Sequence, residues 1–366
     1  MALTDIIIDK IRRAGPISFR EFMEMALYHP LTGYYTSCKD KIGTQGDYYT
    51  SPAFSSLFGQ MIGRQLEEMW RLLGKRSFVV VEYGAGTGLL CKHILEYARN
   101  NTAFYNKLVY CIIEKNDSML KPGEIAAGKV TRLNSIRDIP PLDGCILSNE
   151  LVDNFSVHQV MMNEELMEIF VDYDNGFIER LYPAGSQLKN YLDELGVVLP
   201  KGFRTEINLE AVTWMGEVAK ALRKGFVLTV DYGYPSADLY HCRRSTGTLV
   251  CYHKHRINNC PYQNIGEQDI TTHVNFSALS HWGIKNGLEY GGFTDQARFL
   301  QGTGLTRHIM EMEKKGRISQ QSATEHAMFV RTLLMDMGCK LKVLLQHKAV
   351  KHAQLSGMQF SYPEMV

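Results

Sequence analysis

The sequence contains no apolar run that approaches the roughly 20 residues needed to cross a membrane. Its charges nearly cancel, because 40 Lys and Arg residues stand against 39 Asp and Glu residues and give a formal net charge of +1. This balance gives no electrostatic argument for binding nucleic acid or a membrane. We therefore expect neither a nucleic-acid partner nor membrane insertion.

The chain also lacks the usual signals of export. Its first residues, MALTDIIIDKIRRAGP, place no charged segment ahead of an apolar core, so they do not match a signal peptide. Asp5 and Asp9 are equally unusual in a transit peptide. The eight cysteines include no C-x-x-C pair, and a chain of 366 residues does not need disulfides to fold. We therefore expect reduced thiols and a cytoplasmic location.

Two common catalytic motifs are missing as well. No G-x-S-x-G is present, which argues against a hydrolase with a serine triad. Residues 241–260 hold six His and Cys residues, but their spacing matches neither a zinc ribbon nor a zinc finger. We therefore expect no metal site.

What the sequence does contain is a series of short apolar runs that alternate with helical segments. The runs lie within residues 77–88, 108–116, 143–154 and 225–235. Continuous apolar strands separated by helices are typical of a parallel sheet that is covered on both faces. We therefore predict an α/β fold with an open, Rossmann-like sheet.

Other segments precede or interrupt this pattern. Residues 1–75 have helical periodicity, and we predict that they form a cap on a main domain of residues 76–366. One insertion is expected at about 157–223, where an alternating stretch with a hairpin signal, Asp174-Asn175-Gly176, precedes a helix. A second insertion, at about 236–275, has a loop-like composition.

A glycine-rich turn ends the first apolar run. Gly84, Gly86 and Gly88 form G-x-G-x-G ahead of a helical segment. Glycine permits a tight turn and lets a ligand approach the backbone closely. A dinucleotide site would need a further glycine where Leu89 stands, and a P-loop would need Gly-Lys-Ser/Thr, which is absent. The turn therefore matches neither phosphate-binding motif.

S-adenosylmethionine is the alternative ligand, because it carries no phosphate. Its recognition is expected to use an acid before the glycine turn and another at the end of the second strand. Glu82 and Glu114 occupy these two places, and Ala85 lies inside the turn. The carboxylate of Glu114 can accept both ribose hydroxyls. Two other interpretations stay open: a turn that only packs a helix on the sheet, and a solvated acid at a strand end.

Further motifs occur in order between Ile17 and Leu300. They are ISFREFMEMALYHPLTGYY, GDYYTSP, EYGAGTG, SNELVDNFSVHQV, VDYGYP, GTLVCYHKH, IGEQDITTHVNF and GGFTDQARFL. Together they resemble the MidA-like methyltransferases, a family that includes a mitochondrial complex I assembly factor that methylates an arginine. The resemblance implies a class I methyltransferase sheet with inserted substrate-binding elements. It also implies a protein substrate, by analogy a subunit of a complex I type respiratory enzyme.

The same resemblance implies roles for two loops. The segment GDYYTSP would fold over the cofactor, with Tyr49 and Thr50 as cofactor contacts and Asp47 as a substrate contact. Tyr252 and His255 fall in GTLVCYHKH, where a role as a substrate lid is implied. An aromatic loop packed on the core and a polar surface loop are the alternatives.

The chain departs from the family pattern in two places. Ala53 stands where the family usually has Glu, and Asn154-Phe155-Ser156 replaces a small residue, an aromatic or leucine, and Pro. Both departures are expected beside the site, where they would alter the fit of the substrate and leave the cofactor turn intact.

Acids after the third apolar run are candidates for holding the substrate. Glu150 and Asp153 follow the strand GCILS, at the edge where open α/β sheets bind ligands. A pair of carboxylates can bind a planar guanidinium bidentately, and residues three apart share a face if the segment is helical. We predict these two as catalytic acids, with Asn149 near the reactive end of the cofactor. Acids that only stabilise a helix N-terminus are the alternative.

Two more residues complete the candidate site. Asp231 ends the run 225–235 at the same sheet edge, and we count it among the catalytic acids, although an acid that caps the next turn is the alternative. Asn134 follows an apparent strand, KVTRL, and is a candidate for the adenine edge.

The sequence predicts a methyltransferase that uses S-adenosylmethionine and acts on an arginine of a protein. Two alternatives remain: another N- or O-methyltransferase on the same fold, and a non-catalytic assembly factor with a residual cofactor site. The oligomeric state is left open.

Overall fold

The computed structural model describes residues 2–37, 51–116, 119–120, 128–314 and 331–363. Its main sheet has the strand order β15-β16-β10-β5-β2-β3-β4. Neighbours from β10 through β4 are parallel, whereas β16 runs antiparallel between β10 and β15. The strands are β2 Phe78–Tyr83, β3 Leu108–Ile113, β4 Val130–Leu133, β5 Leu142–Asn149, β10 Leu222–Tyr234, β15 Glu289–Asp295 and β16 Leu341–Lys348. The predicted α/β class and open sheet are confirmed.

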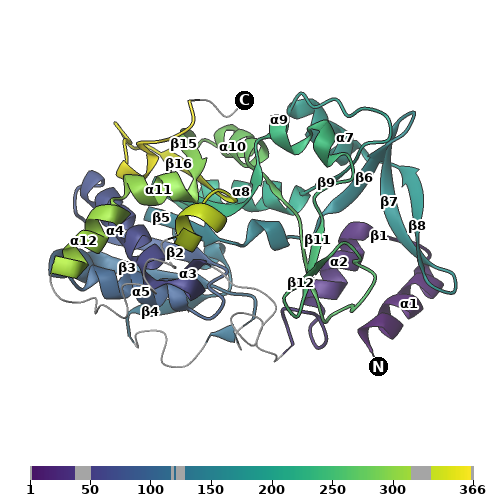
Figure 1. Cartoon of the computed structure of the whole chain (residues 1–366), viewed down its shortest axis with the longest axis horizontal. Helices are drawn as coiled ribbons and strands as arrows, with labels where there is room; N and C mark the ends of the chain where they lie inside the picture. The colour runs from purple at the N-terminus through teal and green to yellow at the C-terminus, as the bar shows by residue number, and fades with distance from the viewer. Residues whose placement is uncertain (1, 38–50, 117–118, 121–127, 315–330, 364–366) are drawn as a thin grey trace.

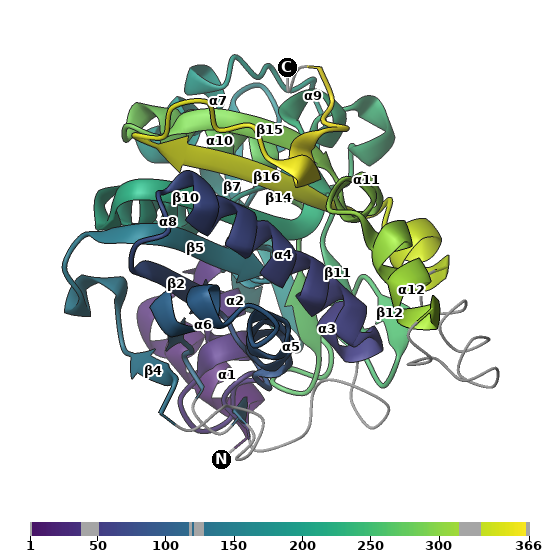
Figure 2. The same cartoon turned by 90° about the vertical axis from the view of Figure 1, so that its left-hand side faces the viewer.

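Helices cover both faces of this sheet, as its apolar strands require (Figure 2). Phe226 and Leu228 of β10 join one core, whereas Val227 joins the other, because successive side chains of a strand point to opposite faces. The first core contains α4 Ser56–Leu72, α5 Leu89–Ala98, α6 Thr102–Lys107, α11 Gln296–Gly302 and the start of α12 Leu305–Lys314. The second contains α7 Ser186–Glu194, α8 Leu209–Ala221 and α10 Phe276–Lys285.

A second sheet lies to one side of the main sheet (Figure 1). It is formed by β1 Ile17–Ser18, β6 His158–Met162, β7 Leu166–Tyr173, β8 Phe177–Pro183 and β9 Arg204–Ile207. The Asp174-Asn175-Gly176 turn joins β7 to β8, so the predicted hairpin is confirmed. Helices α1 Leu3–Ala14 and α2 Phe19–Tyr28 bury Ile7 and Phe22 in a third core, together with Val171 of β7.

The two halves of residues 1–75 therefore pack in different places. Helices α1 and α2 cover the inserted sheet, whereas α4 packs on the main sheet. The division into a cap of residues 1–75 and a main domain of residues 76–366 stays a prediction.

The stretch 236–275 is more regular than its sequence suggests. It contains α9 Ser236–Leu239 and a three-stranded antiparallel sheet of β11 Val250–His253, β12 Arg256–Asn258 and β13 Asp269–Thr271. The short strand β14 Val274–Asn275 then adds to β10. Strands of two to four residues are too short to show a clear alternation of polarity, so the loop-like expectation was wrong here.

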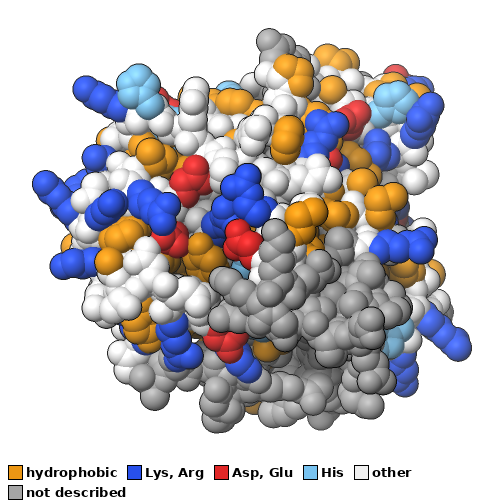
Figure 3. Space-filling model, turned by 60° about the vertical axis from the view of Figure 1, so that its left-hand side comes forward, with side chains coloured by type: hydrophobic (Ala, Val, Ile, Leu, Met, Phe, Trp, Pro, Cys, Tyr) orange, Lys and Arg blue, Asp and Glu red, His pale blue; other side chains and the backbone are white. Residues whose placement is uncertain are grey.

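The remaining elements are short. They are α3 Ser51–Phe54, a π-helical turn Thr332–Asp336, and 3₁₀ turns η2 Ile136–Asp138, η3 Val152–Asn154, η4 Cys242–Arg244 and η6 Ser356–Met358. Among the described residues, no helix combines the length and apolar character required to span a bilayer. Positive and negative side chains are interspersed on the face shown in Figure 3.

A close approach of backbones in the centre of the sheet supplies the first test. A Cβ added to Gly144 of β5 would lie 1.9 Å from the carbonyl oxygen of Val79 in β2. We expect Gly144→Ala to lower the free energy of unfolding by roughly 3 kcal/mol or more, since a central strand must move. Urea denaturation measures the loss.

Gly185→Ala is the matched control for this variant. Gly185 has φ −62° at the start of α7, and a Cβ there would have no neighbour within 4 Å. The control should stay within about 0.5 kcal/mol of the wild type. Equal stability of the two variants would contradict the close approach.

Candidate active site

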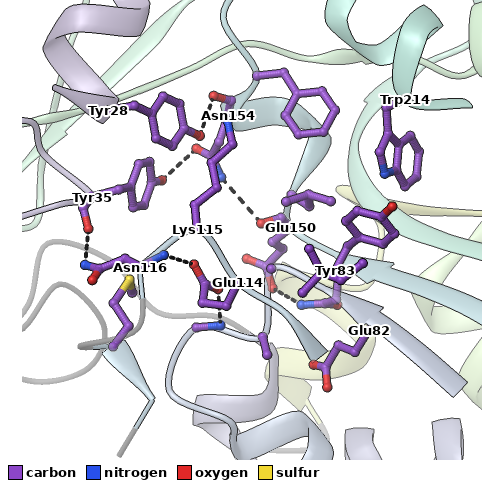
Figure 4. Close-up of a pocket in the computed structure, with 18 of the residues that line it drawn as sticks. Tyr28, Tyr35, Glu82, Tyr83, Glu114, Lys115, Asn116, Glu150, Asn154 and Trp214 are labelled. Carbon is purple, nitrogen blue, oxygen red and sulfur yellow. Dashed lines mark hydrogen bonds between the residues drawn. The ribbon is translucent and has the colours of Figure 1, made fainter. Parts of the chain in front are cut away.

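A cavity of about 400 Å³ opens at the carboxyl ends of β2, β3 and β5 (Figure 4). This is the edge at which open α/β sheets bind ligands. The cavity brings together many of the residues predicted from the sequence. Those that line it are Glu82, Gly84, Ala85, Gly86, Glu114, Asn134, Asn149 and Glu150.

The glycine turn forms the floor on the β2 side. Gly84, Gly86 and Gly88 have φ angles of 68°, 53° and 83°, a left-handed region that other residues adopt only at a cost. A Cβ on Gly84 would also lie 2.7 Å from the side chain of Leu151. Gly88 does not line the cavity and instead precedes the first turn of α5.

Glu114 ties the end of β3 to this turn. Its carboxylate accepts the backbone N–H of Gly86 at 3.0 Å and that of Asn116 at 3.0 Å (Figure 4). Burial raises the pKa of Glu114, and the backbone N–H groups partly oppose that shift. A carboxylate has about four acceptor positions, and these N–H groups do not occupy all of them, which leaves room for a ligand hydroxyl.

Glu82 is the most deeply buried acid on the cofactor side, with 2% of its surface exposed. The hydroxyl of Tyr110 donates to it at 2.7 Å. Burial raises the pKa of Glu82 to about 7, although the Tyr110 hydrogen bond lowers it in part. A buried acid of this kind is costly unless a ligand or a proton satisfies it.

Asn134 and Asn149 lie at different ends of the cavity wall. Asn134 follows β4, and its backbone N–H donates to Asp138 at 3.1 Å. Asn149 ends β5, and its side-chain amide donates to Glu150 at 3.1 Å. The Oδ1 atom of Asn149 is buried without a hydrogen-bond partner, so it is available to a donor on a bound molecule.

The backbone of Glu150 adopts an unusual conformation and is fixed by hydrogen bonds. Its φ is +50°, its backbone N–H donates to the Val230 carbonyl at 2.9 Å, and its carboxylate accepts the N–H of Ser51 at 3.0 Å. Burial, followed by the like charge of Asp231, raises the pKa of Glu150 to about 8. The condition that the segment be helical is not met, because only the short turn η3 forms and Glu150 lies before it.

Asp153 and Asp231 lie behind Glu150 and do not line the cavity. Asp231 accepts the backbone N–H groups of Leu151 and Val152 at 3.1 and 2.8 Å. It therefore caps the turn after the neighbouring strand β5, whereas the alternative considered for it was a cap on the turn that follows its own strand. Burial raises the pKa of Asp231 to about 6.

Asp153 is 5% exposed, and its Oδ1 atom has no hydrogen-bond partner. Burial raises its pKa well above the usual range, and the charges of Asp231, Asp269 and Glu150 raise it further. A negative charge on Asp231 therefore disfavours ionisation of Asp153.

The loop residues implied by the resemblance are placed differently. Asp47, Tyr49 and Thr50 lie outside the described residues. Tyr252 of β11 does not line the cavity, but the carboxylates of Asp153 and Asp269 raise its pKa after burial does. His255 lies in the turn between β11 and β12, with φ +59°, and also does not line the cavity.

Sequence reasoning missed one wall of the cavity. Helix α8 contributes Glu210, Thr213, Trp214 and Glu217, none of which belongs to a motif. The indole nitrogen of Trp214 and the Oε2 atom of Glu210 are buried without hydrogen-bond partners. The residue pattern predicts only a helix here, so no sequence signal pointed to these side chains.

The opposite wall comes from the N-terminal segment and was also missed. The hydroxyl of Tyr28 donates to the Asn154 carbonyl at 3.0 Å, and that of Tyr35 contacts Asn154 Oδ1 at 2.7 Å (Figure 4). Lys115 crosses between the walls, with its ammonium 4.2 Å from the centre of the Tyr28 ring and 3.5 Å from Glu210.

The residues present fit S-adenosylmethionine. The cavity offers a glycine turn open to close approach, the acids Glu82 and Glu114, and orphaned polar atoms on Asn149, Glu210 and Trp214. Among the described residues, no group of three or more His, Cys, Asp or Glu is placed to hold a metal ion.

Comparisons with known proteins agree with this fit. The sequence model of a family described as "Putative S-adenosyl-L-methionine-dependent methyltransferase" matches residues 61–294. A structure from Burkholderia thailandensis, of a COG1565 superfamily member bound to S-adenosyl-homocysteine, is 29% identical with a TM-score of 0.86. The match covers 98% of this chain and 95% of that one.

Two curated relatives are named as protein arginine methyltransferase NDUFAF7 homologues, mitochondrial. The protein from Drosophila melanogaster is 26% identical, over 94% of this chain and 85% of its own length. The protein from Caenorhabditis elegans is 27% identical, over 93% of this chain and 85% of its own length.

Glu114 provides a direct test of the cofactor site. Glu114→Gln removes the charge while keeping the side-chain shape, so we expect the Kd for S-adenosylhomocysteine to rise about tenfold or more. Isothermal titration calorimetry measures the change. Glu96→Gln, on an exposed position of α5, is the control and should bind as the wild type does. An unchanged Kd for Glu114→Gln would rule out its role in the site.

Glu82 gives a prediction about stability and pH. Its pKa in the folded protein is about 7 against an ordinary 4.5, so the folded state loses stability as pH rises through 7. A Gln side chain cannot ionise, and its amide oxygen can still accept the hydrogen bond from the Tyr110 hydroxyl. At pH 8 we expect Glu82→Gln to exceed the wild type by roughly 1 to 3 kcal/mol in unfolding free energy.

The advantage of Glu82→Gln should shrink toward pH 5, where the wild-type carboxyl is protonated in the folded state. Urea denaturation of both proteins at pH 5 and pH 8 measures this, with Glu96→Gln as the exposed control. A difference that does not change with pH would show that the charge of Glu82 is not what costs stability.

Proposed function

Because this chain belongs to the family of S-adenosyl-L-methionine-dependent methyltransferases, we propose that it methylates an arginine side chain of a protein substrate. The cofactor and the reaction class follow from the family, and the arginine target is the proposal. It is supported by the names of relatives that align along nearly the whole chain and by the acids beside the cofactor cavity.

The observation that carries the proposal is a group of carboxylates with no cation. Asp231 lies close enough to Glu150 and Asp153 for its charge to raise both of their pKa values, after burial does. In the described part of the chain, no Lys or Arg forms an ion pair with any of the three. Buried carboxylates without a partner cost free energy, and a bound cation would offset that cost.

A guanidinium suits this place better than an ammonium ion. It is planar and carries five N–H donors in a fixed fork, so one carboxylate can bind it at two points. Glu150 is the member of the group that reaches the cavity (Figure 4). Asp153 and Asp231 do not line the cavity.

Bound S-adenosylmethionine supplies a methyl group that is attached to a positively charged sulfur. Glu150 accepts N–H groups of the guanidinium and keeps the attacking nitrogen aligned with the methyl carbon. A nitrogen–carbon bond forms as the carbon–sulfur bond breaks, and the nitrogen then loses a proton. The bound cation first displaces the proton that Glu150, with a pKa of about 8, holds near neutral pH, and the ionised carboxylate can then take the proton that the nitrogen loses.

Two finer points belong to the same proposal. By resemblance, the substrate is a subunit of a complex I type respiratory enzyme. For location we propose the cytoplasm, supported by the free thiols of all the described cysteines, whereas the two relatives are named as mitochondrial. Cell fractionation distinguishes the two locations.

Glu150→Gln tests the arginine proposal. Wild-type protein and tritiated S-adenosylmethionine should label one or a few proteins of the host lysate, and mass spectrometry should place the label on arginine. We expect Glu150→Gln to reduce transfer at least about a hundredfold, since the charge that holds the cation is lost. Its Kd for S-adenosylhomocysteine should change by less than threefold, roughly 0.6 kcal/mol.

Glu96→Gln again serves as a control and should transfer as the wild type does. Label on small metabolites alone would favour a small-molecule methyltransferase. Cofactor binding without transfer to any molecule would favour a non-catalytic assembly factor. Mass spectrometry of respiratory complex subunits from cells with and without the protein tests the proposed substrate class.

A further inference from the structure

The carboxylate of Glu150 is held through one of its two oxygens. Its Oε1 atom accepts the backbone N–H of Ser51 at 3.0 Å and the side-chain amide of Asn149 at 3.1 Å. Among the described residues, no donor forms a hydrogen bond with the Oε2 atom. Two donors on one oxygen therefore orient the carboxylate and leave its other oxygen for a bound molecule.

Ser51 supplies one of these donors from a segment with little support of its own. It begins α3, a helix of only four residues, and it is completely buried. Isolated helices of this length are not stable, since forming the first turn costs more than its few hydrogen bonds return. The position of the Ser51 N–H group therefore depends on contacts with other parts of the chain.

The side chain of Gln296 provides such a contact. Its Oε1 atom accepts the hydroxyl of Ser51 at 3.0 Å, across 245 positions of the chain. Gln296 is completely buried and begins α11, directly after the last residue of β15. Asp295 fixes this corner, because its carboxylate accepts the backbone N–H of Arg298 and the hydroxyl of Tyr362, both at 2.8 Å. The acceptor for Ser51 is thus attached to the main sheet.

The amide of Gln296 is used on one side only. Within the described part of the chain, its buried Nε2 atom has no hydrogen-bond partner. A buried donor that stays unpaired costs free energy, and a methionine of similar length would avoid that cost. Packing therefore does not explain a glutamine at this place, whereas the hydrogen bond from Ser51 does.

Resting on the role proposed for Glu150 in arginine methylation, we propose that Gln296 is a positioning residue for the Glu150 carboxylate. Gln296 holds the hydroxyl of Ser51, and the backbone N–H of Ser51 holds Glu150 Oε1. The Oε2 atom is then left to bind the guanidinium. Neither Gln296 nor Ser51 lines the cavity, so both act through Glu150 and need not touch the substrate.

This chain of contacts has a consequence for the pH dependence of the reaction. The N–H of Ser51 favours the ionised form of Glu150 and lowers the pKa of that carboxyl, against the larger effect of burial. Loss of the bond therefore raises the pKa of Glu150, and methyl transfer that needs the ionised carboxylate moves to higher pH. A side chain that only packs α11 against its neighbours would lower the rate without moving the pH profile.

Other titratable groups also interact with Glu150. They are Asp231, whose charge raises the pKa of Glu150, and Asp153, Tyr232 and Tyr252, whose own pKa values are raised by Glu150. None of these four residues is changed in the variants that test Gln296, so a shift in the profile reports the Ser51 bond.

Gln296→Met keeps the length of the side chain and removes the acceptor for Ser51. Initial rates of tritium transfer from saturating S-adenosylmethionine to lysate protein are measured from pH 6 to pH 10. We expect the rate at pH 7 to fall about three- to tenfold and the rising limb of the profile to move up by about 0.5 to 1 pH unit. Near pH 10 the rate should approach that of the wild type. The Kd for S-adenosylhomocysteine should stay within about threefold, which also shows that the variant is folded.

Further variants show whether Gln296 acts through Ser51. Ser51→Ala removes the hydroxyl and keeps the backbone N–H, so we expect it to shift the profile as Gln296→Met does. The two changes combined should shift it no further than either alone, since both break the same bond. Gln301→Met, at an exposed position of the same helix, is the matched control and should keep the wild-type profile.

The outcomes separate this inference from the proposed function. If arginine is labelled but Gln296→Met leaves the rate unchanged, or lowers it equally at every pH, the positioning role is overturned and arginine methylation stands. Additive shifts from Gln296→Met and Ser51→Ala would lead to the same conclusion. If Gln296→Met does not bind S-adenosylhomocysteine, Ser51→Ala decides alone, and a wild-type profile overturns the role. Absence of label on arginine with the wild-type protein would overturn both.

Discussion

The loop that follows β5 depends on one carboxylate from the neighbouring strand. Asp231 of β10 accepts the backbone N–H groups of Leu151 and Val152, and no helix forms there to satisfy these donors. Glu150, directly before them, is held with a φ of +50°, which costs roughly 1 kcal/mol for a residue with a side chain. Asp231 thus supports the backbone directly after Glu150, whose carboxylate lines the cavity.

The charge of the Asp231 carboxylate also affects the protonation of the neighbouring acids, and so the kind of substrate that the site favours. Burial raises the pKa values of Asp153 and Glu150, and a negative charge at Asp231 raises both further. At neutral pH Glu150, whose pKa is about 8, therefore holds a proton that a bound cation would displace. The site favours a substrate that brings positive charge with it, and the whole molecule need not be acidic to attract one, since its formal net charge is +1.

The site residues that could be predicted from the sequence are those that directly follow a strand. The glycine turn, Glu82 and Glu114 each follow a strand directly, so strand order alone brings them to one edge of the sheet. Trp214 and Tyr28 could not be found this way, because they reach the cavity through helices whose placement depends on tertiary packing. The β11–β13 sheet escaped prediction for a different reason, since its strands have only three or four residues. The conformation of Glu150 was also beyond the residue pattern, because its backbone N–H donates to Val230 and the next two N–H groups donate to Asp231, both some 80 positions away.

The segments outside the main sheet meet at Asn154, one of the departures from the family pattern. The hydroxyls of Tyr28 and Tyr35 contact it from the N-terminal side, and Tyr35 also donates to Asp269 of β13 at 2.8 Å. The backbone N–H of Thr272 donates to the Asp153 carbonyl at 3.0 Å, which attaches β13 to the same loop. The N-terminal helices and the second insertion thus support the loop that carries Glu150 from two sides. A bare methyltransferase sheet would leave this loop open to water, whereas here the added segments both shape it and limit access to it. Their size therefore reflects the construction of the active site as well as any surface that they offer to a protein substrate.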